Sequence, residues 1–209
     1  MLISPEQCIG FLAVAVAVTA SPGPDNLMVL SVGMSRGRKQ GMAFGLGCAL
    51  GCLSHTLLAA LGVGALIAAS PLAFTLLKAA GGLYLIWLGI GALRSRGGAK
   101  VGAASGPDES LLRLFGKGLL ANAINPKVIL FFLSFLPQFV VAARGDVAWQ
   151  TAQLGLLFTL QGCLLFGLLG YFSGAVGAWI NRKPRAGLWL DRIAGAIFVG
   201  LGLRMLLAR

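Results

Sequence analysis

The sequence has very few acidic residues and few charged residues of any kind. Only six of the 209 residues are Asp or Glu, and charged residues make up 11% of the chain, compared with roughly 25% in ordinary soluble domains. Long polar stretches are also scarce, so a soluble domain of useful size cannot be fitted between the apolar segments. The composition excludes an ordinary soluble protein and predicts one integral membrane domain over residues 1–209.

Signatures of redox, zinc and nucleotide chemistry are missing as well. The four cysteines lie inside apolar stretches without a CxxC spacing, and no GxxxxGK[ST] phosphate-binding loop occurs. We therefore expect a protein that is not an enzyme, needs no cofactor and no resident metal, and draws its energy from an ion or substrate gradient.

The basic residues are numerous, and their positions favour a membrane over nucleic acid as the partner. The formal net charge is +11, but most Lys and Arg residues fall in connections between apolar segments, as membrane anchors do. The connections after the first, third and fifth segments hold twelve of the 17 bases: Arg36, Arg38, Lys39, Arg94, Arg96, Lys100, Arg113, Lys117, Arg182, Lys183, Arg185 and Arg192. The positive-inside rule then predicts that both termini lie outside the cytoplasm.

Six apolar segments can be drawn, which predicts an all-α membrane protein. Their approximate ranges are 5–35, 41–69, 72–93, 111–141, 147–180 and 188–207. The segments form two similar halves, repeat 1 at about 1–94 and repeat 2 at about 111–209, joined by a polar linker at about 95–110. Because each half crosses the membrane three times, the second half must be inverted, a pattern typical of secondary transporters. If the first segment only dips into the membrane, five spans remain and the N-terminus faces inward.

Two proline motifs interrupt the first and fourth segments at membrane depth. The run Ser21–Asn26, SPGPDN, divides the first, and Asn125-Pro126-Lys127 divides the fourth. Irregular backbone at this depth must be buried in protein or line a wet cavity. Each motif is predicted to begin a second half-helix at its proline, with free N–H groups and a partial positive charge at the start.

Asp25 and Lys127 follow these prolines and carry opposite charges at equivalent positions of the two repeats. A charge at the bilayer centre costs at least about 2.5–3.5 kcal/mol, so both should face each other, a ligand or water. We predict that Asp25 attracts the α-ammonium group of a zwitterion, and that Lys127 with nearby N–H groups attracts its α-carboxylate. The predicted substrate-binding residues are Gly23, Pro24, Asp25, Asn26, Asn122, Asn125, Pro126 and Lys127. A structural alternative stays open, in which the prolines only kink helices and Asp25 and Lys127 form a permanent ion pair.

His55, the only histidine, lies midway along the second segment. An imidazole titrates near neutral pH and can relay protons, but a hydrogen bond to a neighbouring helix explains the residue equally well. Asp25 is the other candidate for proton coupling, because a carboxylate in a poorly hydrated site can take up a proton.

The two motifs, together with Ser35-Arg36-Gly37 and the sequence GLYLIWLG at 82–89, resemble the LysE/RhtB family of amino-acid exporters over essentially the whole chain. The resemblance implies a six-segment carrier of a bacterial-type inner membrane that exports amino acids or close derivatives in exchange for protons. The homoserine, threonine and leucine exporters of the family look more similar than its lysine exporters. The expected partners are an amino acid, protons and the bilayer, with a homodimer formed through small-residue helix faces.

Three other interpretations stay open. A carrier of the same architecture could move a metal ion or other small solute, using Cys48, Cys52 and His55 as soft ligands. A membrane redox protein would use the pair of cysteines. A channel would show flux without saturation.

Overall fold

The computed structural model describes residues 3–95 and 109–207. The linker predicted at about 95–110 lies almost wholly outside these residues. Within the described ranges the chain consists of α1 (Pro5–Ala20), α2 (Pro24–Arg36), α3 (Arg38–Ala69), α4 (Pro71–Leu93), α5 (Leu111–Ala123), α6 (Pro126–Leu130), α7 (Val147–Tyr171), α8 (Ser173–Arg182) and α9 (Pro184–Leu207). After α6 the chain continues as a π-helical turn η1 (Phe131–Phe135) and the 3-10 turns η2 (Leu136–Phe139) and η3 (Ala142–Arg144).

Polar caps and prolines determine where most helices begin. Four helix starts have a Ser or Asp side chain that accepts a hydrogen bond from a backbone N–H of the first turn, which satisfies a group that the helix leaves unpaired. These caps are Ser4, Ser70, Ser110 and Asp146. Prolines stand at the start of five helices, where a missing N–H is harmless. They are Pro5, Pro24, Pro71, Pro126 and Pro184.

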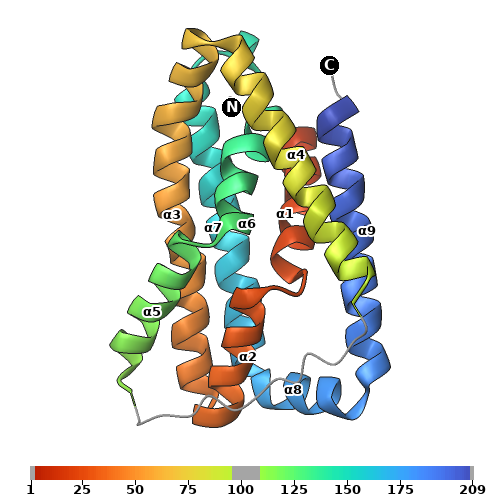
Figure 1. The fold of residues 1–209 in the computed structure, drawn as a ribbon. Helices are drawn as coiled ribbons and strands as arrows, with labels where there is room; N and C mark the ends of the chain where they lie inside the picture. The colour runs from red at the N-terminus through yellow and green to blue at the C-terminus, as the bar shows by residue number, and fades with distance from the viewer. Residues whose placement is uncertain (1–2, 96–108, 208–209) are drawn as a thin grey trace.

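The two proline motifs break their helices as predicted. The chain bends by 56° between α1 and α2, and by 51° between α5 and the segment that begins at Pro126. In Figure 1, α1 lies above α2, whereas α5 lies below α6. The interrupted helices therefore run in opposite directions, which an inverted repeat requires.

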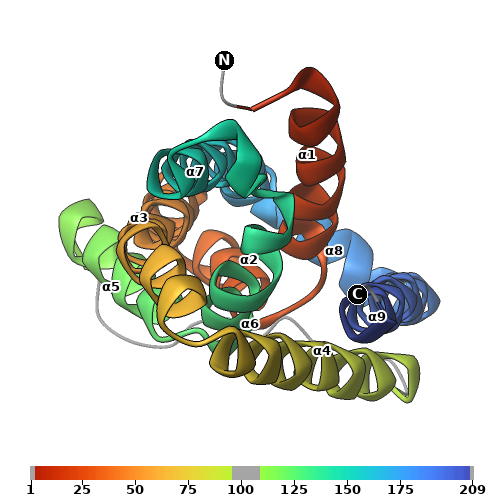
Figure 2. The same ribbon diagram turned by 90° about the horizontal axis from the view of Figure 1, so that it is seen from above.

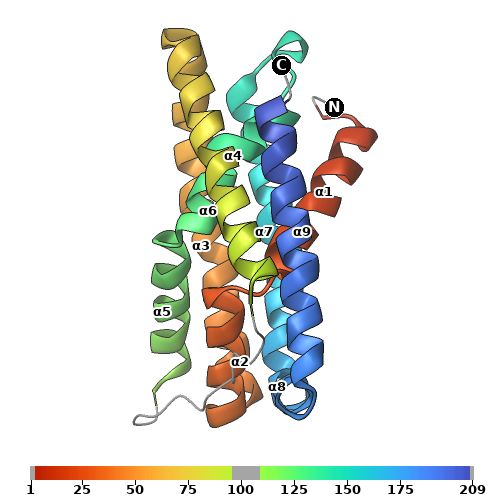
Figure 3. The ribbon, with the colours of Figure 1, turned by 45° about the vertical axis from the view of Figure 1, so that its right-hand side comes forward.

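The remaining long helices pack in pairs around the interrupted ones. Helix α3 lies along α7, and α4 lies along α9 (Figures 2 and 3). Among the described residues, α3, α4 and α7 are each long and apolar enough to cross a membrane, and each bent pair adds one span, giving up to five. Helix α9 does not meet the same measure, since it carries Arg185, Asp191, Arg192 and Arg204. The sixth span therefore stays a prediction.

The fifth segment differs from its predicted course. Instead of one helix over 147–180, the chain ends α7 at Tyr171 and turns into α8, which runs across the lower end of the bundle (Figure 1). The cause is contact with α2: a Cβ atom on Gly33 would lie 2.1 Å from Ser173 Oγ, and one on Gly177 would lie 1.9 Å from Met34 Sδ. Because neither proline nor a polar run marks this bend, hydropathy alone did not predict it.

Both described ends of the chain lie at the top of Figure 1, and the α2–α3 junction and α8 lie at the bottom. The basic residues of these lower junctions, such as Arg36, Arg38 and Arg182, are thus on the side opposite the termini. Which side faces the cytoplasm remains the prediction of the positive-inside rule.

Glycine allows α5 to pack directly on the backbone of α3. A Cβ atom on Gly47 of α3 would lie 2.0 Å from the Phe115 carbonyl oxygen, and one on Gly118 of α5 would lie 2.0 Å from the Phe44 carbonyl oxygen. No side chain fits at either position, so the two helices are held at backbone contact.

Gly118 and its neighbour Gly116 provide a matched test of this packing, because Gly116 has nothing within 4 Å. We expect Gly118→Ala to lower the stability of the detergent-solubilised protein by about 1–3 kcal/mol, the usual effect of overpacking. Gly116→Ala should leave stability unchanged or raise it by about 0.4–1 kcal/mol. Thermal unfolding measures both variants, and equal unfolding temperatures would contradict the close approach.

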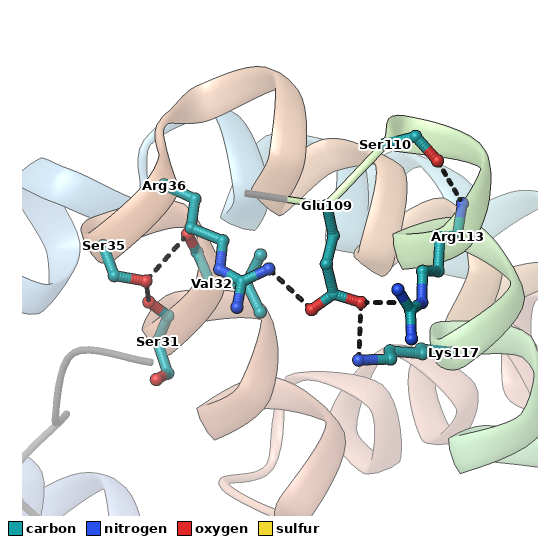
Figure 4. Close-up of polar contacts among 8 residues, drawn as sticks. All are labelled: Ser31, Val32, Ser35, Arg36, Glu109, Ser110, Arg113 and Lys117. Carbon is teal, nitrogen blue, oxygen red and sulfur yellow. Dashed lines mark hydrogen bonds and ion pairs between the residues drawn. The ribbon is translucent and has the colours of Figure 1, made fainter. Parts of the chain in front are cut away.

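Glu109 joins the lower ends of α2 and α5 through three basic side chains (Figure 4). Its Oε1 lies 2.7 Å from Arg36 Nη1, and its Oε2 lies 2.6 Å from Lys117 Nζ and 3.3 Å from Arg113 Nε. These cations cover the carboxylate, whose side chain is 8% exposed. Hydrogen bonds from Lys117 and Arg36 lower the pKa of Glu109 to about 2.

The lowered pKa of Glu109 determines how its contribution to folding stability changes with pH. A glutamate in an unfolded chain titrates at about 4.3, so the ion pairs stabilise the fold above that pH and lose their effect as the pH falls towards about 2. We expect Glu109→Gln to unfold at a lower temperature than wild type at pH 7, and the difference to shrink below about pH 4.3. Arg113→Gln, at a side chain 70% exposed, is the mild control. A Glu109→Gln protein as stable as wild type at pH 7 would show that the ion pairs contribute nothing.

Candidate functional site

Residues of repeat 2 and α2 meet the unpaired carbonyl groups at the end of α1. Lys127 Nζ donates to the Val18 carbonyl at 3.2 Å and to the Ser21 carbonyl at 3.5 Å. Asn26 Nδ2 donates to the Thr19 carbonyl at 2.9 Å. The last turn of α1 thus ends inside the protein with its carbonyls satisfied, as membrane depth demands.

The end of α5 is met by residues of repeat 1 in a corresponding way. Asn122 Nδ2 donates to Asp25 Oδ2 at 2.8 Å, and His55 Nε2 donates to the Asn122 carbonyl oxygen at 3.1 Å. Cys52 Sγ lies 3.4 Å from Asn122 Oδ1, to which it donates. Asn122 therefore connects the start of α2 to two residues of α3.

A small cavity lies where these ends meet. Its volume is about 20 Å³, which is room for about one water molecule. It is lined by Val18, Thr19, Asp25, Cys52, Asn122, Lys127, Val128, Phe158, Gly162 and Phe166. Asp25 is 4% exposed and Lys127 is 8% exposed, so one acid and one base are buried around the same small volume.

Asp25 and Lys127 do not form an ion pair with each other. The ion pairs that Glu109 makes with Arg36, Arg113 and Lys117 have no counterpart between Asp25 and Lys127. Asp25 is held by Asn122, while Lys127 is held by backbone carbonyls and lies over the Phe198 ring at 5.9 Å. This differs from the permanent pair of the structural alternative, since each charge has a neutral partner.

The other predicted site residues mostly shape the backbone around the cavity. Asn125 caps α6 by accepting from the Lys127 N–H at 3.0 Å, and Pro24 and Pro126 begin α2 and α6. Asn26 holds the end of α1. A Cβ atom on Gly23 would lie 3.0 Å from Lys127 Nζ, so Gly23 leaves room for that ammonium group.

His55 lies outside the cavity that Asp25 and Lys127 share. It faces a separate hollow of about 110 Å³, lined also by Leu58, Ala123, Ile129, Phe132 and Leu133. Its hydrogen bond to the Asn122 carbonyl matches the structural explanation given by the sequence, and a proton-coupling role for His55 stays a prediction.

Several cavity residues were not predicted. Phe158, Gly162 and Phe166 belong to α7, where apolar residues and glycine look the same whether they face lipid, another helix or a cavity. Thr19 is a hydroxyl residue in an apolar helix, which is common and does not by itself indicate a binding site. The sequence feature that could have placed it at the cavity is its position six residues before Asp25.

Metal and thiol interpretations find little support in the geometry. All four cysteines are free. Across residues 3–95 and 109–207, no group of three His, Cys, Asp or Glu side chains is close enough to share a metal ion.

The fold and the site together define a class of protein. Interrupted helices that meet around a buried polar cavity, within a bundle of apolar helices, are the architecture of a membrane transport protein.

Comparison with known proteins gives the family. The sequence profile of the LysE type translocators matches residues 16–209. The threonine efflux protein of Escherichia coli (strain K12) is 34% identical over 210 residues, which cover 95% of this chain and 98% of that protein. An uncharacterized membrane protein of Vibrio cholerae is 33% identical over 204 residues, 96% of this chain and 97% of that protein. The homoserine/homoserine lactone efflux protein of Salmonella typhimurium is 28% identical over 204 residues, 98% of each chain. No solved structure matches.

The chain therefore belongs to the LysE type translocator family, which confirms the resemblance found in its proline motifs.

Gly23→Ala tests whether the position of the Lys127 ammonium group matters for transport. The backbone of Gly23 is extended, with φ −165°, so alanine introduces no strain there. Its Cβ atom would push Lys127 Nζ by a few tenths of an ångström, and we expect transport to slow by about 3- to 10-fold with little change in unfolding temperature. Gly10→Ala, whose nearest new contact is a Phe139 ring atom at 3.8 Å, should change neither. Full activity of Gly23→Ala would show that this position tolerates displacement.

Proposed function

We propose that the protein exports neutral amino acids, and that it binds the zwitterion in the cavity between its two interrupted helices. One observation carries the proposal: Asp25 and Lys127 line the same buried cavity with opposite charges and are not paired with each other. The Asp25 carboxylate offers an acceptor for an α-ammonium group, and the Lys127 ammonium offers a donor for an α-carboxylate.

The charges that line the cavity limit the substrate. Asp25 and Lys127 are the only ionised side chains among the described lining residues, and the two α-groups engage both. A charged substrate side chain would then be buried without a partner, which is strongly unfavourable. The apolar walls formed by Val18, Val128 and Phe158 suit a small uncharged side chain. The relative named as a threonine efflux protein carries a name that agrees with a neutral amino acid as substrate.

Transport of an amino acid through this site would require one of two packed clusters to separate at a time. On the side of α1, Phe11, Phe131 and Phe158 pack ring against ring, with Phe131 and Phe158 centroids 5.0 Å apart. On the side of α2, Val32, Phe44 and Leu114 belong to the second buried cluster. Because a volume of about 20 Å³ holds little more than one water molecule, an amino acid enters or leaves only when one cluster separates.

Asp25 also provides a route for proton exchange. A proton bound to its carboxylate removes the charge that holds the α-ammonium group, so proton and substrate compete for the same site. A carrier with this competition moves a proton inward for an amino acid moved outward. His55, bonded to the carbonyl of Asn122, is the second candidate for the coupled proton.

Counterflow in proteoliposomes tests the proposal, with a panel of labelled amino acids at two external pH values. We expect saturable, pH-dependent exchange of neutral amino acids, and a loss of at least about tenfold in Asp25→Asn and in Lys127→Met. The matched controls are Asp146→Asn, which keeps a capping side chain on α7, and Lys39→Met at an exposed position; both should transport normally. Full counterflow by Asp25→Asn and Lys127→Met at equal protein amounts would overturn the assignment.

A further inference from the structure

A hydrogen-bonded pair, Thr19 and Gln161, lies beside the two charges and has no part in binding the α-groups. Thr19 is in the last turn of α1 and 5% exposed, and Gln161 is in α7 and 8% exposed. Gln161 Nε2 donates to Thr19 Oγ1 at 2.8 Å and to the Phe158 carbonyl oxygen at 2.9 Å. Because a carbonyl oxygen can only accept, Phe158 fixes the NH₂ end of the amide towards Thr19.

This pair leaves one donor and one acceptor free. The Thr19 hydroxyl accepts from Gln161 and donates to no residue in the described part of the chain. The other end of the same amide, Gln161 Oε1, is buried without a partner. Buried polar atoms are nearly always hydrogen-bonded, and an unsatisfied one is unfavourable. The Thr19 hydroxyl lines the cavity and is available to a ligand there, and Gln161, which is not among the lining residues, adjoins the cavity through its hydrogen bond to Thr19.

The two free groups together match a substituent that can both accept and donate, which a hydroxyl does through one atom and a side-chain amide through two. A hydroxyl group can accept from Thr19 and donate to Gln161 at once. An ammonium group offers only donors, a carboxylate offers only acceptors, and a methyl group offers neither.

Thr19 also lies where a substrate side chain can reach it. It lines the same cavity as Asp25 and Lys127, and it bears the hydroxyl group among the described lining residues. The carbonyls of Val18 and Ser21, on either side of Thr19 in the chain, bind Lys127 Nζ. The hydroxyl is therefore within the space that a zwitterion held by the two charges would share.

We propose that Thr19, positioned by Gln161, forms a hydrogen bond with the substrate side chain and thereby selects amino acids that carry a side-chain hydroxyl. The proposal rests on the proposed function, since it takes the α-groups to be held by Asp25 and Lys127. A comparison of threonine with valine separates the effect of hydrogen bonding from the effect of size, because valine has a methyl group where threonine has its hydroxyl. Bound valine leaves the Thr19 and Gln161 groups unpaired in a buried site, which is the situation in which a hydrogen-bonding pocket discriminates strongly.

The test is competition between threonine and valine in proteoliposome counterflow. Wild type should prefer threonine by at least about tenfold, the ratio expected from unpaired buried hydrogen-bonding groups. Thr19→Val should abolish the preference by slowing threonine while valine is carried as well as before, and Thr19→Ser should restore it. Gln161→Leu should weaken it. Thr159→Val is the matched control, because Thr159 is also buried in a helix but donates only to the Gly155 carbonyl of its own helix at 3.0 Å.

The outcomes separate this proposal from the function on which it rests. An unchanged threonine-to-valine ratio in Thr19→Val would overturn the selectivity role, as would an equal loss of both substrates in Thr19→Val and Thr19→Ser, which marks a structural residue. Counterflow of other neutral amino acids, without a preference for the hydroxyl, would also overturn it and leave the proposed function standing. Counterflow of no amino acid by wild type would overturn both.

Discussion

The structure depends on satisfying the backbone groups that two broken helices expose at membrane depth. Water meets such groups in a soluble protein, but in hydrocarbon each unpaired N–H or C=O is strongly unfavourable. Lys127 and Asn26 meet the carbonyls of α1, and His55 meets the carbonyl of Asn122 at the end of α5. The end of α1 is thus held by Lys127, next to the break in the second half, and the end of α5 is held by His55 of α3 and by the hydrogen bond from Asn122 to Asp25, so neither interruption is independent of the other.

Lys127 has a structural role at the end of α1 in addition to the proposed role in binding a substrate carboxylate. Its ammonium group binds the Val18 and Ser21 carbonyls in the structure. A carboxylate that binds Lys127 therefore competes with the end of α1 for the same donors. Under the proposed function, this competition would couple ligand binding to the path of α1.

The sequence predicted the features that local chemistry dictates. Prolines at 24 and 126, with one charged residue after each, were enough to predict where the helices break and that Asp25 and Lys127 are buried, because proline chemistry and charge burial act over a few residues. The bend at Phe172 was not predictable, since it follows from contacts of Ser173 and Gly177 with α2. Thr19 and Phe158 likewise became cavity residues through the packing of α1 against α7, which no local pattern encodes.

The two interrupted helices are packed differently. On the lower side in Figure 1, α5 is held against α3 by backbone contact at Gly47 and Gly118, and against α2 by the ion pairs of Glu109. On the upper side, α1 stands beside α7 around a hollow of about 390 Å³, lined by Ile3, Pro5, Cys8, Gln153 and Leu157. Side-chain rotation suffices to rearrange aromatic rings such as Phe11 and Phe131, whereas backbone contacts separate only when a whole helix moves. Under the proposed function, the upper cluster is therefore expected to open more easily than the lower one, where α5 would have to move as a unit away from both α2 and α3.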